Sequence, residues 1–166
     1  MIQFRSILIV ALNLREMKFA EEFVEKYTKT LAPDQRENMY HFSLALIESL
    51  KNNLQKSLDH LNNINFELFT FKYDVKIRQL GLYYELEYYS EAMGVVDAFR
   101  HFLSKNKKVS KYNKERHMNF LKYYVKVLKA KETGNTDEMY ILHKMLEKEN
   151  DIPAIYWLRE KTKKTA

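Results

Sequence analysis

The segment Tyr89–Leu103 reads YSEAMGVVDAFRHFL and has the most regular apolar pattern in the chain. Its apolar positions recur at intervals of three and four residues, namely Ala92, Val95, Val96, Phe99 and Leu103. This spacing places them on one face of an α-helix, with polar side chains on the other. The segment therefore predicts an amphipathic helix over residues 89–104.

The same periodicity recurs on both sides of this segment, as in Phe4, Ile7, Leu8, Ala11 and Leu12. Polar or proline-containing breaks separate the periodic stretches. We predict helices over 2–14, 17–31, 35–51, 54–62, 67–86, 89–104, 112–131, 137–149 and 153–163.

Three local signals predict how individual helices begin. Asp34 followed by Glu37 is typical of a capping box, Thr136 suits an N-cap, and Pro153 suits the first turn of the last helix.

Composition agrees with an all-α protein. The 166 residues are 46% hydrophobic and 30% charged, which indicates one folded domain over residues 1–166. Only three glycines and two prolines are present, too few for the many tight turns of a β-sandwich or barrel. The chain has no cysteine, which excludes a disulfide framework and a thiol nucleophile but leaves the compartment open.

A repeat connects the periodic stretches. Met17–Ala20, Leu54–Ser57 and Tyr89–Ala92 each place a small residue three positions after an apolar one, and the small residues are 37 and 35 positions apart. Large residues follow each small residue seven positions later: Tyr27, Ile64 and Phe99. A small side chain lets two helices approach closely, and a large one fills the next groove.

This pattern resembles the tetratricopeptide repeat (TPR) superfamily, and residues 65–110 resemble the C-terminal part of uncharacterised bacterial TPR-like proteins. The resemblance implies an α-α superhelix, a solenoid of antiparallel helical hairpins at 2–31, 35–62, 67–104 and 112–149, with a capping helix at 153–163. The family's first-helix tryptophan is absent, and its Leu-Gly pair occurs only at Leu80-Gly81.

Catalytic and cofactor motifs are missing. The five histidines show no i, i+4 pair typical of a helical metal site, and three scattered glycines cannot form a phosphate-binding loop. Glu85 and Glu87 are two positions apart and so point away from each other on a helix. We therefore expect no enzyme, no metal and no cofactor.

The expected function is protein–protein interaction, on a concave surface formed by the first helix of each hairpin. Aromatic anchors and positive charge are the candidate contacts. The candidate partner-binding residues are Tyr83, Tyr84, Tyr88, Lys105, Lys107, Lys108, Lys111, Lys114 and Arg116.

Two alternatives remain open. The basic 105–116 segment could make the chain a nucleic-acid-binding module, since the net charge is +6. The N-terminal helix is apolar on several sides, which favours a homo-oligomer, a partner at that end, or a C-terminal piece of a longer array. The apolar run at 6–12 is too short for a signal peptide or a membrane span, so we expect a cytoplasmic protein.

Overall fold

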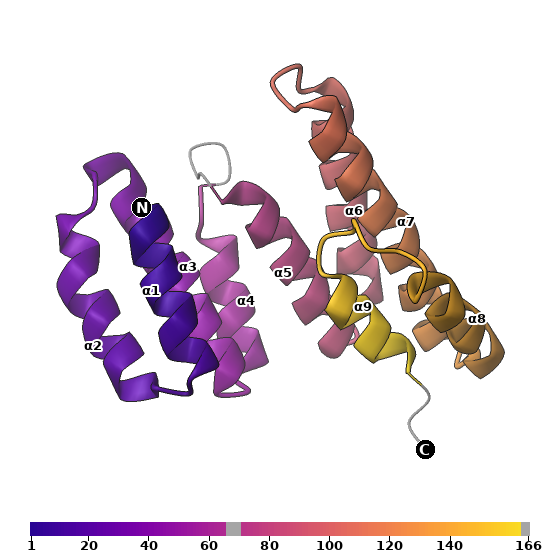
Figure 1. Cartoon of the computed structure of the whole chain (residues 1–166), viewed down its shortest axis with the longest axis horizontal. Coiled ribbons are helices and arrows are strands. Elements are labelled where there is room, and N and C mark those ends of the chain that lie inside the picture. The colour runs from indigo at the N-terminus through magenta and orange to yellow at the C-terminus, as the bar shows by residue number, and fades with distance from the viewer. Residues whose placement is uncertain (66–70, 164–166) are drawn as a thin grey trace. The chain divides into compact units, whose positions relative to one another are not determined.

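Nine α-helices and one 3₁₀ turn follow one another in the part of the chain that the structure describes (Figure 1). This computed structural model describes residues 1–65 and 71–163, and no strand occurs within them. The elements are α1 (Ile2–Asn13), α2 (Met17–Tyr27), η1 (Thr28–Thr30), α3 (Pro33–Leu50), α4 (Leu54–Asn62), α5 (Lys72–Glu85), α6 (Tyr89–Lys105), α7 (Lys111–Glu132), α8 (Thr136–Leu146) and α9 (Ile155–Thr162).

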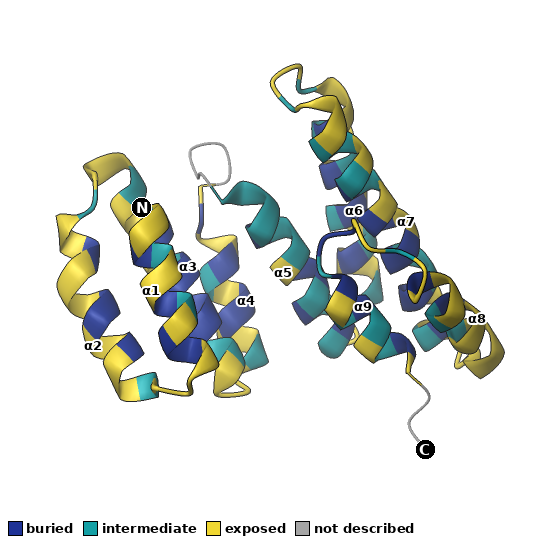
Figure 2. Ribbon diagram, viewed as in Figure 1, coloured by how far each residue is buried: buried dark blue, intermediate teal, exposed yellow. Residues whose placement is uncertain are grey.

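The chain divides into two units, Met1–Leu82 and Tyr83–Ala166. In unit 1, α1 packs against α2 and α3, and α3 packs against α4. In unit 2, α7 packs against α6, α8 and α9. Each unit has its own apolar core, with Phe42 and Leu61 fully buried in the first and Phe99 and Tyr124 in the second (Figure 2).

The same turn geometry joins the two helices of four pairs: α1 and α2, α3 and α4, α5 and α6, and α7 and α8. The residue two positions after the first helix has a positive φ of 61–65°, and these residues are Arg15, Asn52, Glu87 and Gly134. The next backbone N–H then donates to a carbonyl five residues earlier, as from Glu16 to Ala11 at 2.9 Å and from Asn135 to Ala130 at 2.9 Å. This is the Schellman arrangement, which satisfies carbonyls at a helix C-terminus.

The predicted small residues lie at one register relative to these turns. Ala20, Ser57 and Ala92 each come five positions after a positive-φ residue, and all three are buried. Ser57 also donates its hydroxyl to the Ala45 carbonyl at 2.7 Å, which ties α4 to α3. The prediction that these small residues lie on the packing faces of their helices is confirmed by their burial.

The three large residues predicted to fill grooves differ in burial. Ile64 and Phe99 are buried, as predicted. Tyr27, the last residue of α2, is 41% exposed, so its predicted burial is wrong. The predicted helix over 17–31 is correspondingly shorter.

The three predictions of helix starts are also wrong in detail. Helix α3 begins at Pro33, with Ala32 as its N-cap and no side-chain cap, so Asp34 and Glu37 form no capping box. Asn135, and not Thr136, caps α8 by accepting from the Glu138 N–H at 3.0 Å. Pro153 lies before α9, which follows a left-handed Ala154. The predicted start of a helix at residue 67 lies outside the described residues.

Helix α9 closes the core of unit 2. Trp157 meets the ring of Tyr84 edge-on, with centroids 5.2 Å apart, and stacks on Tyr124 at 6.1 Å. The guanidinium of Arg159 donates to the backbone carbonyls of Leu146 at 3.1 Å and Glu149 at 2.6 Å. Because helix C-terminal carbonyls lack intrahelical partners, Arg159 satisfies part of the α8 terminus.

Candidate binding surfaces

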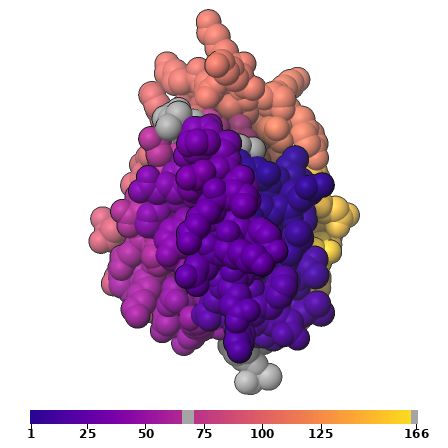
Figure 3. Space-filling view, turned by 90° about the vertical axis from the view of Figure 1, so that its left-hand side faces the viewer, coloured from indigo at the N-terminus to yellow at the C-terminus, as the bar shows by residue number. Residues whose placement is uncertain are grey.

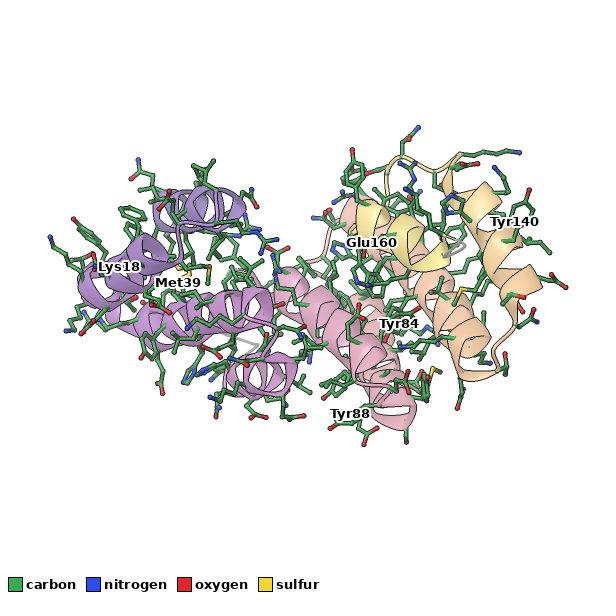
Figure 4. The ribbon with its side chains drawn as sticks, turned by 90° about the horizontal axis from the view of Figure 1, so that it is seen from below. Lys18, Met39, Tyr84, Tyr88, Tyr140 and Glu160 are labelled. Carbon is green, nitrogen blue, oxygen red and sulfur yellow. The ribbon has the colours of Figure 1, made fainter. Side chains whose placement is uncertain are left out.

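Tyr84 is a core residue, although the sequence places it among the candidate partner contacts. Its side chain is 5% exposed, and Lys131 lies over its ring, with Nζ 4.3 Å from the centroid. Burial raises the pKa of Tyr84 to about 12. Figure 4 shows Tyr84 among the side chains of unit 2 and Tyr88 at its edge. Tyr84 therefore packs in the core of unit 2 and exposes little surface to a partner in this conformation.

Tyr83 and Tyr88 lie nearer the surface. Tyr88 is 40% exposed, and its ring centroid is 6.4 Å from that of Tyr83. The two rings support each other at the turn between α5 and α6. They remain candidate contacts, but they form a small pair and not an extended aromatic groove.

The basic residues of segment 105–116 fall into two groups: some have partners in unit 2, and the others are exposed to solvent. Arg116 pairs with Asp151 at 2.6 Å, and the Tyr112 hydroxyl donates to the same carboxylate at 3.0 Å. Lys114 donates to the Ser104 carbonyl at 3.4 Å. These contacts join α7 to neighbouring segments, so Arg116 and Lys114 serve the fold of unit 2.

The remaining lysines of this segment face solvent. Lys105, Lys107 and Lys108 are exposed in the connection between α6 and α7. None of them has a carboxylate within ion-pair distance among the described residues. Lys111 approaches Glu115 only to 3.9 Å, and its side chain is 90% exposed, so water screens that pair.

An apolar groove runs between α1 and α2, which share the face of unit 1 turned toward the viewer in Figure 3. Ile7, Val10 and Leu14 project from α1, and Phe19 projects from α2; they are 45%, 57%, 67% and 50% exposed. The groove has a volume of about 440 Å³ and is lined by Ser6, Ile7, Val10, Ala11, Leu14, Glu16 and Phe19.

The sequence pattern grouped Ile7 with the buried residues of the first helix. The structure instead buries Phe4, Leu8, Ala11 and Leu12, and Ile7 turns outward with Val10 and Leu14. These three positions are spaced i, i+3, i+7 and form a second apolar stripe. Helix α1 is therefore apolar on two sides. One side packs against α2 and α3, and the other side, with Ile7, Val10 and Leu14, is exposed.

A second exposed apolar group lies on unit 2. It consists of Tyr140, Ile141 and Met145 on α8 and Tyr156 on α9, and Tyr156 is 81% exposed. Lys144 lies 5.8 Å from the Tyr140 ring and Arg159 6.0 Å from the Tyr156 ring.

Two histidines far apart in sequence meet in unit 1. The Nδ1 atoms of His41 on α3 and His60 on α4 are 3.1 Å apart. Burial and the charge of His60 lower the pKa of His41, and Glu37 opposes them. No sequence signal could reveal this pair, because tertiary contact between α3 and α4 creates it.

Within residues 1–65 and 71–163, no three His, Cys, Asp or Glu side chains converge in a way that could hold a metal ion. No helix in the same ranges combines the length and apolar character needed to cross a bilayer.

Comparisons with known proteins add no family to this description. No protein-family model matches the chain, and neither the curated proteins nor the solved structures contain a significant match.

Proposed function

We propose that this chain is a TPR-like helical-repeat module that binds a protein partner, and that the α1–α2 groove is the binding site. Binding, and not catalysis, is the activity assigned. The observation that carries the proposal is the exposed apolar lining of that groove. Contiguous exposed apolar surface of this kind marks interaction sites in folded proteins.

Two features support the repeat part of the proposal. The four recurring turns have one backbone geometry, and the first three positive-φ residues are spaced 37 and 35 positions apart, like the buried small residues. Hairpins of constant length with a constant turn are the building units of helical-repeat proteins.

The form of the groove favours one amphipathic helix as the occupant. Ile7, Val10 and Leu14 follow one helix face over about 10 Å, since α-helices rise 1.5 Å per residue. A partner helix with apolar residues at i, i+3 or i+4, and i+7 would fit along this face.

The test is affinity capture from native lysate with the full chain and two variants. Val10→Glu/Leu14→Glu places charge in the groove at two exposed positions, which leaves the core intact. Lys29→Gln is the control, because it removes a positive charge at an exposed site in η1, beyond the C-terminal end of α2, and leaves the groove lining unchanged. We expect wild type and Lys29→Gln to retain the same specific protein and the groove variant to lose it, with at least a tenfold loss in affinity for the purified partner.

Equal capture by all three proteins would contradict the groove as the site. Light scattering on the same samples tests the homo-oligomer alternative. A wild-type dimer that the groove variant reduces to a monomer would assign the groove to a second copy of the chain.

A further inference from the structure

Positive charge is concentrated on one helical hairpin of unit 2. Residues 100–131 contain eleven basic side chains and a single acidic one, Glu115. Since the whole chain has a net charge of +6, the rest of the chain is net acidic. The basic residues of this hairpin are Arg100, Lys105, Lys107, Lys108, Lys111, Lys114, Arg116, Lys122, Lys126, Lys129 and Lys131.

Five of these eleven side chains have partners within unit 2. Arg100 pairs with Asp97, Lys111 with Glu115, Arg116 with Asp151 and Lys131 with Glu87, at 2.6–3.9 Å. Lys114 donates to a backbone carbonyl. The other six have no carboxylate within ion-pair distance in the described chain: Lys105, Lys107, Lys108, Lys122, Lys126 and Lys129.

The geometry of α7 aligns much of this charge. Lys122, Lys126 and Lys129 are spaced i, i+4, i+7 and therefore share one helix face. Lys111 lies five turns before Lys129 on that face, and a rise of 1.5 Å per residue separates the two by about 27 Å along the axis. We call Lys111, Lys122, Lys126 and Lys129, with Lys105, Lys107 and Lys108 at their N-terminal end, the lysine face.

This face is the solvent side of α7. Lys122 and Lys129 are exposed and Lys126 is half-buried, while Phe120, Leu121, Tyr124, Val127 and Leu128 on the other side form the core of unit 2. The chain keeps the arrangement although like charges at i, i+4 repel and destabilise a helix. A ligand that neutralises these charges would relieve that repulsion.

The chemistry of the lysine face favours phosphates over a protein. Protein interfaces are depleted of lysine at their centre and depend on aromatic or apolar anchors. Among the described residues 100–131, the one large apolar side chain that is strongly exposed is Tyr112, and its hydroxyl is bonded to Asp151. Exposed lysines without apolar anchors are the usual contacts to a nucleic-acid backbone.

We propose that the lysine face binds the phosphate backbone of a double-stranded nucleic acid without reading its sequence. A straight face of about 27 Å matches about eight base-pair steps of 3.4 Å. Single strands are bound mainly through exposed aromatic stacking platforms, and the lysine face has none. The site differs from the α1–α2 groove, lies in the other unit, and does not depend on it.

The test is fluorescence anisotropy with a labelled 20-base-pair DNA duplex and the matching RNA duplex, at salt concentrations from 50 to 200 mM. The variant is Lys122→Gln/Lys126→Gln/Lys129→Gln. Its control, Lys18→Gln/Lys29→Gln/Lys56→Gln, removes the same charge from exposed positions in unit 1. Circular dichroism verifies that both remain helical.

We expect wild type and control to bind a duplex, with log affinity falling linearly with log salt. The lysine-face variant should bind at least tenfold more weakly, and its salt slope should be smaller by about 2–3, because each phosphate contact contributes about one unit. The groove variant Val10→Glu/Leu14→Glu should bind the duplexes as wild type does.

Three results would overturn the proposal. The first is no duplex binding by wild type at 50 mM salt, and the second is equal loss in the control. The third is tighter binding, through the same lysines, to a single-stranded oligonucleotide, to polyglutamate or to phosphatidylserine vesicles. That last result would reassign the lysine face to a single strand, an acidic protein or a membrane surface, respectively.

Discussion

At the scale of single residues, the tertiary environment changes what side chains can do. Tyr84 and Arg116 are candidate contacts by residue type, yet a buried ring and a 2.6 Å ion pair with Asp151 give both a structural role. His41 shows the converse, because a residue with no sequence signal acquires a lowered pKa beside His60. Local chemistry therefore depends on partners that are 19 to 73 positions away.

The His41–His60 pair predicts loss of stability in mild acid. Burial and His60 hold the pKa of His41 below its ordinary value of 6.5, so the folded chain prefers the neutral ring and the unfolded chain binds a proton more readily. The stabilisation is present above pH 6.5 and is lost as the pH falls through the folded pKa.

Urea unfolding between pH 7.5 and 5.0 checks this expectation. The free energy of unfolding of wild type should fall more steeply than that of His41→Gln, which cannot titrate. Parallel pH profiles for the two proteins would show that His41 does not couple protonation to folding.

At the scale of elements, one turn organises each hairpin. Three of the four left-handed positions hold residues with a side chain, namely Arg15, Asn52 and Glu87, and only Gly134 is a glycine. Residues other than glycine are strained at a positive φ, and asparagine is strained less than most. The repeated geometry therefore persists although the sequence of the turn varies.

Substituting two glycines separates turn strain from helix propensity. Gly134→Ala should lower the free energy of unfolding by about 1 kcal/mol, because alanine is strained at a φ of 65°. Gly94→Ala, in the middle of α6 with no atom within 4 Å of the added Cβ, should raise it by about 0.5–1 kcal/mol. Urea denaturation followed by circular dichroism measures both, and equal signs would refute the left-handed turn as the cause.

At the scale of the whole molecule, the two units differ in surface character. Unit 1 carries the apolar groove, and unit 2 carries the lysine face and the closing helix α9. The rings of Trp157, Tyr84 and Tyr124 link α9 to α5 and α7, and Lys161 pairs with Glu85 at 2.8 Å. Helix α9 is therefore part of the core of unit 2 and not an appendage.

Trp157→Ala tests this role. The variant removes the ring contacts with Tyr84 and Tyr124. We expect the free energy of unfolding to fall by about 2–3 kcal/mol. This is less than for a fully buried tryptophan, because Trp157 is half-buried. Tyr156→Ala is the matched control, because Tyr156 is the preceding residue on α9 and is 81% exposed. We expect this substitution to change the free energy of unfolding by less than about 0.5 kcal/mol. Equal effects in the two variants would mean that α9 contributes little to the core.

The sequence by itself determined the helices and much of their pairing. The apolar periodicity of Ala92, Val96, Phe99 and Leu103, and the spacing of the small residues, depend on contacts within one helix or one hairpin. Such local patterns specify which face of a helix is buried and where two helices approach. The coarse all-helical prediction is therefore confirmed, whereas the TPR-like superhelix stays a proposal.

Only the tertiary structure decided which candidate residues remain available to a partner. It buried Tyr84, neutralised Arg116 with Asp151, turned Ile7 outward and brought His41 to His60. It also gave Arg116 and Lys114 partners within unit 2, while Lys122, Lys126 and Lys129 have no carboxylate within ion-pair distance among the described residues. The physical reason is that burial and ion pairing depend on which segments distant in sequence meet, and residue spacing within one helix carries no information about them.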